Sequence, residues 1–343
     1  MQKRTFKSNP FVFSKYSVSF FTHARKRRAT TRRIAKRPRT RSMSDETRSE
    51  MQRVIKFAKR KQTEYGKLWE HLTALDNMVG MWEAKRAVVR QLKFLIVNRG
   101  EKDGHFLNTV LTGNPGTGKT TLARILFLIW QATNSLGGRA AEQRFTVARR
   151  SSFVARYLGQ TADKTRKFLQ KAHGVVFIDE AYSLCYSDSD EYGKIALDCI
   201  NEYMSSNPEC IIIIAGYEKE LESHFFSVNP GLRRRFQWKF VVSDYELPEL
   251  ADIFLKQIDT FGWRTKITKE QLLQTFRDTN CKFNDNGGST HNLLFHCKMA
   301  HAMRVFPRRS SKMLTFTDIQ QGIKTFSDGN VNKDGGGMLS MYS

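Results

Sequence analysis

The sequence lacks the features of a disulfide-bonded or membrane-spanning protein. Its five cysteines are an odd number with no C-x-x-C pair, which favours reduced thiols in an intracellular compartment over a disulfide framework or a zinc site. Apolar runs such as Ile125–Trp130 and Ile211–Ala215 are far shorter than the ~20 residues that a membrane-spanning helix requires. We therefore expect no membrane anchor.

Acidic residues are absent from residues 1–44, which hold fourteen of the 57 lysines and arginines. The rest of the chain, with 43 basic against 33 acidic residues, is only moderately basic. The clusters Arg25–Arg28 and Lys36–Arg39 resemble nuclear-import or polyanion-binding patches, which favours the nucleus. Alternatives are an organelle transit segment, because the tail is also rich in serine, and an inert disordered arm.

Composition divides the remaining chain into four segments. We expect a charged connector or helix at 45–70, an α/β domain at 71–243, a small all-helical domain at 244–326 and a flexible glycine-rich end at 327–343. In the α/β domain, strand patterns at 108–112, 144–148, 175–178 and 211–215 alternate with helix patterns at 121–131, 162–172 and 194–204. This alternation predicts a parallel sheet with helices on both faces. The last domain has helix patterns at 248–258, 268–279, 289–304 and 317–325.

A complete phosphate-binding loop follows the first expected strand and occupies residues 113–121. The run Gly113-Asn114-Pro115-Gly116-Thr117-Gly118-Lys119-Thr120, followed by Thr121, matches G-x-x-x-x-G-K-[ST] at every fixed position. Its glycines let backbone N–H groups converge on phosphate oxygens at a helix N-terminus. We expect Lys119 to contact the β- and γ-phosphates and the Thr120 hydroxyl to bind Mg²⁺. The loop therefore predicts a site for ATP with Mg²⁺.

An apolar strand that ends in two acids supplies the second half of the site. Val175–Ile178 is followed directly by Asp179 and Glu180. Ligands collect at the carboxyl ends of strands in such sheets, so we expect Asp179 to hold the Mg²⁺ shell. Glu180 is placed to polarise the attacking water, a role typically worth ~10²–10⁴ in rate. These two acids predict hydrolysis of the bound ATP.

Five segments, taken in order, resemble the AAA+ ATPases of the CbbX (CfxQ)/SpoVK type, a family that includes the red-type Rubisco activases. They are the phosphate loop, Arg156–Thr165, Gly174–Leu184, Ile211–Tyr217 and Asn229–Phe236, and the likeness spans about residues 70–325. The resemblance implies an AAA+ core with a helical lid. It also implies a homo-oligomeric ring, a hexamer, that remodels or threads a protein client through a central pore.

The resemblance implies roles for residues outside the two motifs. Val79 and Gly80 match the segment that lies along the adenine, and Tyr157 matches the pore-loop aromatic that grips the client. Arg235 matches the arginine finger of a neighbouring subunit, with Arg233 as a second candidate. From the residues alone, Tyr157 is as often a packed loop aromatic, and the arginines could form a solvated or polyanion-binding patch.

Two positions near the expected site are unusual or unassigned. His291, in Gly288-Ser289-Thr290-His291, stands where the family has a lid arginine that senses the γ-phosphate. A histidine on the face of an amphipathic helix is an equal alternative. The residue that orients the water after Ala215 is not assigned, because the family has Gly-Tyr there, as in Gly216-Tyr217.

Three functions follow from these observations. The leading one is a ring-forming ATPase that remodels a protein client. The second is a nucleic-acid-associated motor or loader tethered by residues 1–44, whose binding would be independent of sequence and would weaken steeply with salt. The third is a non-enzymatic scaffold that binds ATP, although such a protein would not need Glu180.

Overall fold

The computed structural model describes residues 42–98, 107–136, 143–187, 189–207, 210–279, 281–307 and 312–334. The chain divides into the units Met1–Thr40 and Arg41–Ser343, and the described residues all belong to the second. The basic clusters at Arg25–Arg28 and Lys36–Arg39 and the glycine run at 335–337 lie outside the described residues. Across the described ranges, no helix combines the length and the apolar character needed to cross a membrane.

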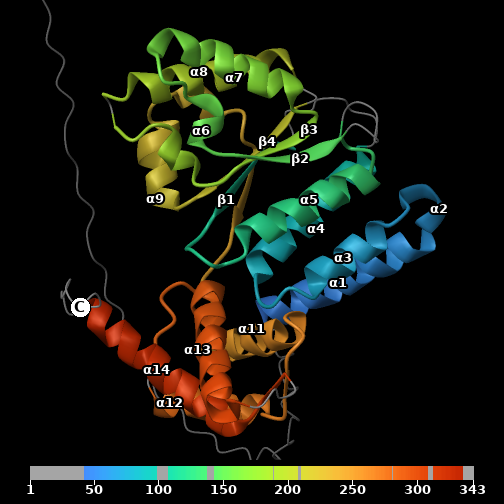
Figure 1. Ribbon diagram of the computed structural model, residues 1–343. Helices are drawn as coiled ribbons and strands as arrows, with labels where there is room; N and C mark the ends of the chain where they lie inside the picture. Colours follow the sequence, from blue (N-terminus) through green and yellow to red (C-terminus); the bar gives the residue numbers. More distant parts are fainter. Residues whose placement is uncertain are drawn as a thin grey trace, which may run out of the picture. The chain divides into compact units, whose positions relative to one another are not determined.

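A parallel sheet of five strands forms the centre of the α/β domain (Figure 1). Its strands are β1 (Thr109–Thr112), β2 (Arg144–Ala148), β3 (Gly174–Ile178), β4 (Ile211–Gly216) and β5 (Trp238–Val241), in the order β2-β3-β4-β1-β5. All residues of β1, β3 and β4 are buried, as expected for parallel strands covered on both faces. The carboxyl ends of β1, β3 and β4 therefore meet at one edge of the sheet.

Helices cover both faces of this sheet (Figure 1). On one face lie α4 (Trp82–Val97) and α5 (Lys119–Ala132), and on the other α7 (Leu158–Lys171) and α8 (Glu191–Ser206). Successive side chains of β4 alternate between the two cores: Ile213 packs with the α4 and α5 cluster, whereas Ile214 packs with the α8 cluster. Short turns connect these elements: α6 (Arg150–Phe153), η2 (Ala181–Leu184), α9 (Glu218–Leu221), η3 (Glu222–Phe226) and α10 (Pro230–Arg233).

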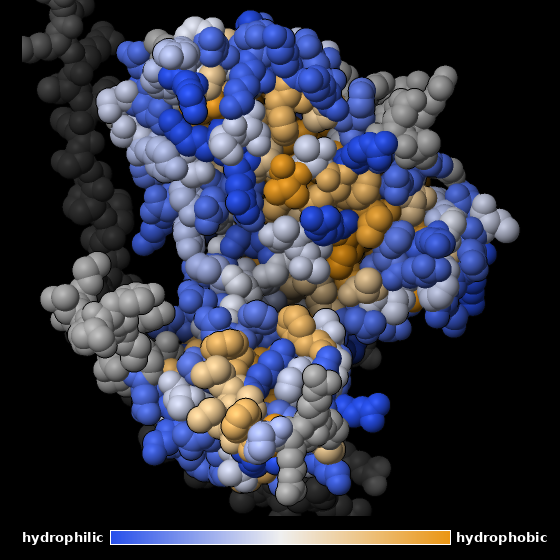
Figure 2. Space-filling model, viewed as in Figure 1, coloured by the Kyte–Doolittle hydropathy of each residue, from blue (hydrophilic) through white to orange (hydrophobic). Residues whose placement is uncertain are grey.

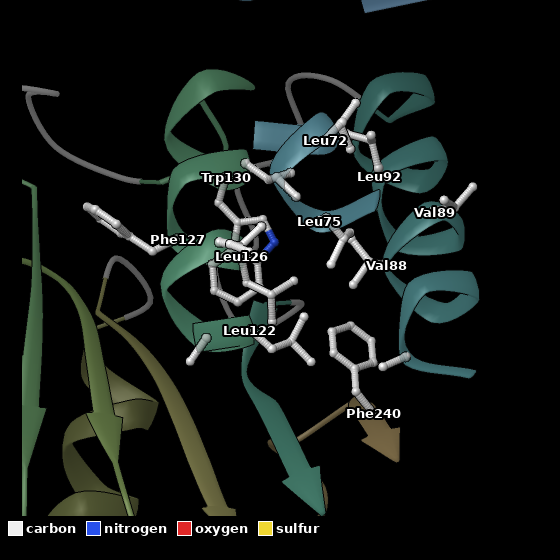
Figure 3. Close-up of a cluster of buried hydrophobic side chains, with 14 of the residues drawn as sticks. Leu72, Leu75, Val88, Val89, Leu92, Leu122, Leu126, Phe127, Trp130 and Phe240 are labelled. Carbon is white, nitrogen blue, oxygen red and sulfur yellow. The ribbon is translucent and has the colours of Figure 1, made fainter. Parts of the chain in front are cut away.

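The charged segment before the α/β domain is helical and forms part of its core. It contains α1 (Met43–Arg60), α2 (Gln62–Tyr65) and α3 (Leu68–Asp76). Figure 3 shows Leu72 and Leu75 of α3 pointing toward α4 and α5, where they join Trp130 in one cluster. Because α1 buries one apolar stripe and exposes its charges, its composition alone resembled that of a connector.

The C-terminal domain, or lid, has its own core and four helices, as the sequence predicted. These are α11 (Leu247–Thr260), α12 (Lys269–Asp278), α13 (Gly287–Val305) and α14 (Phe316–Asp334). Figure 2 shows apolar residues gathered on the lid surface, and Phe295, Met299 and Met303 of α13 are exposed.

Three expectations about strands and helix ends need correction. The strand β5 was not expected, because only Phe240 of its four residues is buried. The lid is not purely helical, since β6 (Arg264–Thr265) and β7 (Met313–Leu314) form a short parallel pair. Residues 327–334 are not a flexible end but the last turns of α14, whose Phe326 is buried against Phe283.

Candidate nucleotide-binding site

A cavity of about 810 Å³ lies between the α/β domain and the lid. Four parts of the α/β domain line it: the loop after α3, the phosphate loop, the end of β3 with η2, and the end of β4. The lid contributes residues of α11 and the N-terminus of α13, with Tyr245 between the domains. Cavities of this size hold small-molecule ligands and cofactors.

The phosphate loop has the backbone conformation that its glycines predict. Gly116 and Gly118 have left-handed φ angles of +69° and +91°. A Cβ at Gly116 would lie 2.0 Å from the Asp285 carbonyl oxygen, so only glycine fits there. The Thr117 hydroxyl donates to the Asn114 carbonyl at 2.8 Å, which ties the loop to itself. The loop therefore leads into α5 with its backbone held for an anion at the helix N-terminus.

Lys119 begins α5 and lies on the wall of the cavity. Its ammonium donates to the carbonyl oxygens of Gly113 and Asn114, both at 2.8 Å. Burial lowers the pKa of Lys119, and the carboxylates of Asp179 and Glu180 counteract that effect. A partly desolvated cation at this point suits phosphate oxygens.

The acidic end of β3 lies beside α5. The Thr120 hydroxyl donates to Asp179 Oδ2 at 3.3 Å. Glu180 has a left-handed φ of +51°, uncommon for a residue other than glycine, and its N–H donates to Asp179 Oδ1 at 3.2 Å. Within the described ranges, no group of three or more His, Cys, Asp or Glu side chains is arranged to hold a metal ion. A hydroxyl with one carboxylate fits Mg²⁺, which keeps several waters and binds through few protein ligands plus substrate phosphates.

Two tyrosines line the cavity together with these acids, and sequence reasoning did not identify Tyr182. The rings of Tyr182 and Tyr217 have centroids 5.6 Å apart. Burial, followed by the charge of Glu180, raises the pKa of Tyr182 to about 12. A Cβ at Gly216 would lie 2.9 Å from the Tyr182 ring, so Gly216 makes room for it. The Gly-Tyr pair at the end of β4 therefore has a packing role next to Glu180.

A hydrogen-bond network that sequence patterns did not predict joins the phosphate loop to the lid. Asn286, buried before α13, donates to the Pro115 carbonyl at 3.3 Å and to Asp244 Oδ1 at 2.8 Å. Its side-chain oxygen accepts from the Tyr245 N–H at 3.0 Å. The Tyr245 hydroxyl donates to the Thr117 carbonyl at 2.7 Å. We call Asn286, Asp244 and Tyr245 the lid clasp.

Most of the predicted site residues meet in the cavity. Those that line it are Val79, Pro115, Gly116, Gly118, Lys119, Thr120, Thr121, Asp179 and Glu180. Gly113, Asn114 and Thr117 instead support the loop through the contacts described above. Gly80 lies against the Glu249 side chain, since a Cβ there would be 2.6 Å from Glu249 Oε1. His291 is exposed on α13 with its ring 5.2 Å from that of Phe261, and it does not line the cavity.

The residues assigned to partners lie away from the cavity of their own chain. Tyr157 is 69% exposed and immediately precedes α7, which begins four residues earlier than expected. Arg235 donates to the Gly231 carbonyl at 2.8 Å and to the Ser205 hydroxyl at 2.5 Å. Arg233 forms an ion pair with Glu222.

Fold and site together define a P-loop nucleotide-binding domain with a helical lid. The family model described as "ATPase family associated with various cellular activities (AAA)" matches residues 109–244. Stage V sporulation protein K of Bacillus subtilis is 34% identical over 258 residues, covering 71% of this chain and 78% of that protein. Protein CbbX of Cereibacter sphaeroides is 30% identical, covering 71% and 81%. The chain belongs to the CbbX/CfxQ-type AAA+ ATPase family, which confirms the resemblance found in the sequence.

The solved structures agree at the level of fold. The FIGL-1 AAA domain in complex with ADP superposes with a TM-score of 0.50 at 19% identity, covering 77% of this chain and 90% of that one. Family membership implies nucleotide binding and supports ATPase activity in general.

Proposed function

We propose that the protein is a Mg²⁺-dependent ATPase that works as a homo-oligomeric ring, a hexamer, and remodels or threads a protein client. The observation that carries the proposal is the convergence of Lys119, Thr120, Asp179 and Glu180 on one wall of the cavity. Neither a non-hydrolytic scaffold nor a simple phosphate-binding loop needs Glu180 in that position.

In the proposed reaction, water attacks the γ-phosphorus, the bond to the β–γ bridging oxygen breaks, and ADP leaves with phosphate. Lys119 and the loop N–H groups bind the phosphate oxygens, and Glu180 accepts the proton of the attacking water. Thr120 and Asp179 would hold Mg²⁺, which neutralises phosphate charge when it is bound. Tyr182 and Tyr217 line the same cavity as Glu180.

The ring is supported by the position of Arg235 outside its own cavity. An arginine that serves a neighbouring subunit must lie at a head-to-tail interface, and such interfaces close into rings. AAA proteins typically assemble in this way. The exposed Tyr157 at the start of α7 is the residue we propose to contact the client.

A nucleic-acid-tethered motor is the second candidate, supported by the fourteen unopposed basic residues of 1–44. Those residues lie outside the described part of the chain. A chain without residues 1–44 that binds DNA as tightly as the full chain would remove this candidate.

The decisive experiment compares Mg-ATP binding by calorimetry with steady-state hydrolysis in three proteins. Lys119→Ala should abolish binding, because it removes the ammonium that we assign to the β- and γ-phosphates. Glu180→Gln should bind ATP but hydrolyse it ~10²–10⁴-fold more slowly, because an amide cannot accept the proton. If Lys119→Ala bound and hydrolysed ATP as the parent does, the proposal would be wrong.

A further inference from the structure

The loop between α3 and α4 forms part of the wall of the cavity. We call residues 76–81 the base-side loop, because Asn77, Met78 and Val79 line the cavity. Gly80 and Met81 both have left-handed φ angles, +59° and +57°. This conformation is unfavourable for a methionine and persists only where surrounding contacts enforce it.

A buried lysine beneath the loop supplies such contacts. Lys85 of α4 is 1% exposed, and its ammonium donates to the Asp76 carbonyl at 3.0 Å and to the Met78 carbonyl at 2.5 Å. The same ammonium lies 4.6 Å from the centroid of the Trp82 ring. A buried ammonium is costly unless it is hydrogen-bonded, so these carbonyls and Lys85 hold one another in place.

A second lysine holds the carbonyl between those two. Lys256 of α11 donates to the Asn77 carbonyl from the lid side and lines the cavity. Three successive carbonyls of the base-side loop are thus bound by two lysines, one from each domain. The backbone N–H and carbonyl of Val79, the next residue, make no hydrogen bond with the described residues.

We propose that Lys85 is a positioning residue for base selection: by binding the carbonyls of Asp76 and Met78 it fixes the base-side loop, so that the Val79 backbone reads the base as adenine. The inference rests on the proposed ATPase function. A backbone N–H beside a C=O complements the N1 acceptor and N6 amino donor of adenine. Guanine presents a carbonyl and an N–H there, so acceptor would meet acceptor and donor would meet donor.

The charge of Lys85 adds a dependence on pH. Burial lowers the pKa of Lys85 to about 8; the carboxylates of Asp76 and Glu249 raise it, and the cations of Arg48 and Lys256 lower it further. Below that pH the ammonium binds both carbonyls, whereas above it the charge is lost and the contacts weaken. The preference of the parent protein for ATP over GTP should therefore fall as pH rises through about 8.

The test measures dissociation constants for Mg-ATP and Mg-GTP in full-length Lys85→Met. Losing two charge-assisted hydrogen bonds should weaken ATP binding about tenfold or more. GTP binding should change little, so the ATP/GTP ratio collapses while kcat at saturating ATP is retained. Lys93→Met is the matched control, because Lys93 lies on the same helix but is exposed and paired with Glu50. We expect this control to keep the parent's ratio.

The results distinguish a failure of the Lys85 role from a failure of the proposed ATPase function. If Lys85→Met keeps the parent's ATP/GTP ratio, or weakens both nucleotides equally, the positioning role is wrong while the ATPase stands. If the parent binds no ATP, the proposed function fails and the inference fails with it. If Lys85→Met does not fold, Lys85→Gln takes its place, and a parent-like ATP/GTP ratio in that variant overturns the inference.

Discussion

The two walls of the cavity are built in different ways. The phosphate side consists of two short continuous segments. Residues 113–121 directly follow the buried strand β1, and residues 179–180 directly follow the buried strand β3. On the lid and base side, single residues from α4, α11 and the segment before α13 reach the loops through individual hydrogen bonds. The phosphate side is therefore fixed by backbone and sheet, whereas the other side depends on a few polar contacts between domains. Substitutions on the phosphate side should therefore abolish ATP hydrolysis. Substitutions on the lid and base side should instead change the coupling of the lid to the nucleotide or the selectivity for the base.

The largest expected effect concerns Arg235, which we propose completes the site of a neighbouring subunit. Arg235→Ala should reduce ATP turnover ~10³–10⁵-fold, the range typical of an arginine finger, while leaving nucleotide affinity intact. Hydrolysis and calorimetric binding should be measured on assembled protein. Arg234→Ala is the control, since Arg234 is exposed and adjacent. Parent-like turnover in the Arg235 variant would mean that the residues of a single chain are sufficient for ATP hydrolysis.

The next effect separates the lid clasp from the chemistry. Asn286→Ala removes the acceptor of the Tyr245 N–H and one donor to the exposed Asp244 carboxylate, which still accepts from Asn114 at 2.8 Å. Each lost hydrogen bond should cost about 0.5–1.5 kcal/mol. We expect lower thermal stability and weaker ATP binding, because Pro115 is no longer tied to the lid. If this variant matched the parent in melting temperature and in ATP affinity, the lid clasp would contribute neither to stability nor to nucleotide binding.

Sequence predicted the phosphate side well because its signals are local. A G-x-x-x-x-G-K-[ST] run between a strand and a helix, and two acids after an apolar strand, need no knowledge of distant residues. The lid clasp could not be predicted, because Asn286 and Asp244 are 42 residues apart and meet only after the lid has packed. The role of Lys85 could not be predicted either, because a lysine in a helix usually indicates an exposed face.

Composition was least informative where neighbouring elements decide burial. Of the two alternatives for segment 45–70, a charged connector or a helix, the structure has the helix, and α1 buries Met51, Ile55 and Ala58 in the main core. Strand β5 lies at the edge of the sheet with one fully buried residue, so its pattern was too weak to detect. In both places the deciding information is the neighbouring element, which a single window of sequence does not contain.

The smallest expected effect concerns His291 and tests whether this residue contacts the bound nucleotide. The family resemblance placed it near the γ-phosphate, but its ring packs near Phe261 and it does not line the cavity. His291→Ala should change ATP affinity and turnover by less than about twofold, as exposed substitutions away from a site usually do. His291→Arg is the informative partner, because it restores the family residue: higher turnover in that variant would show that the lid closes far enough to bring this position to the phosphates. If His291→Ala instead lost activity as severely as Asn286→Ala, the lid would carry a second functional contact with the nucleotide beyond the clasp.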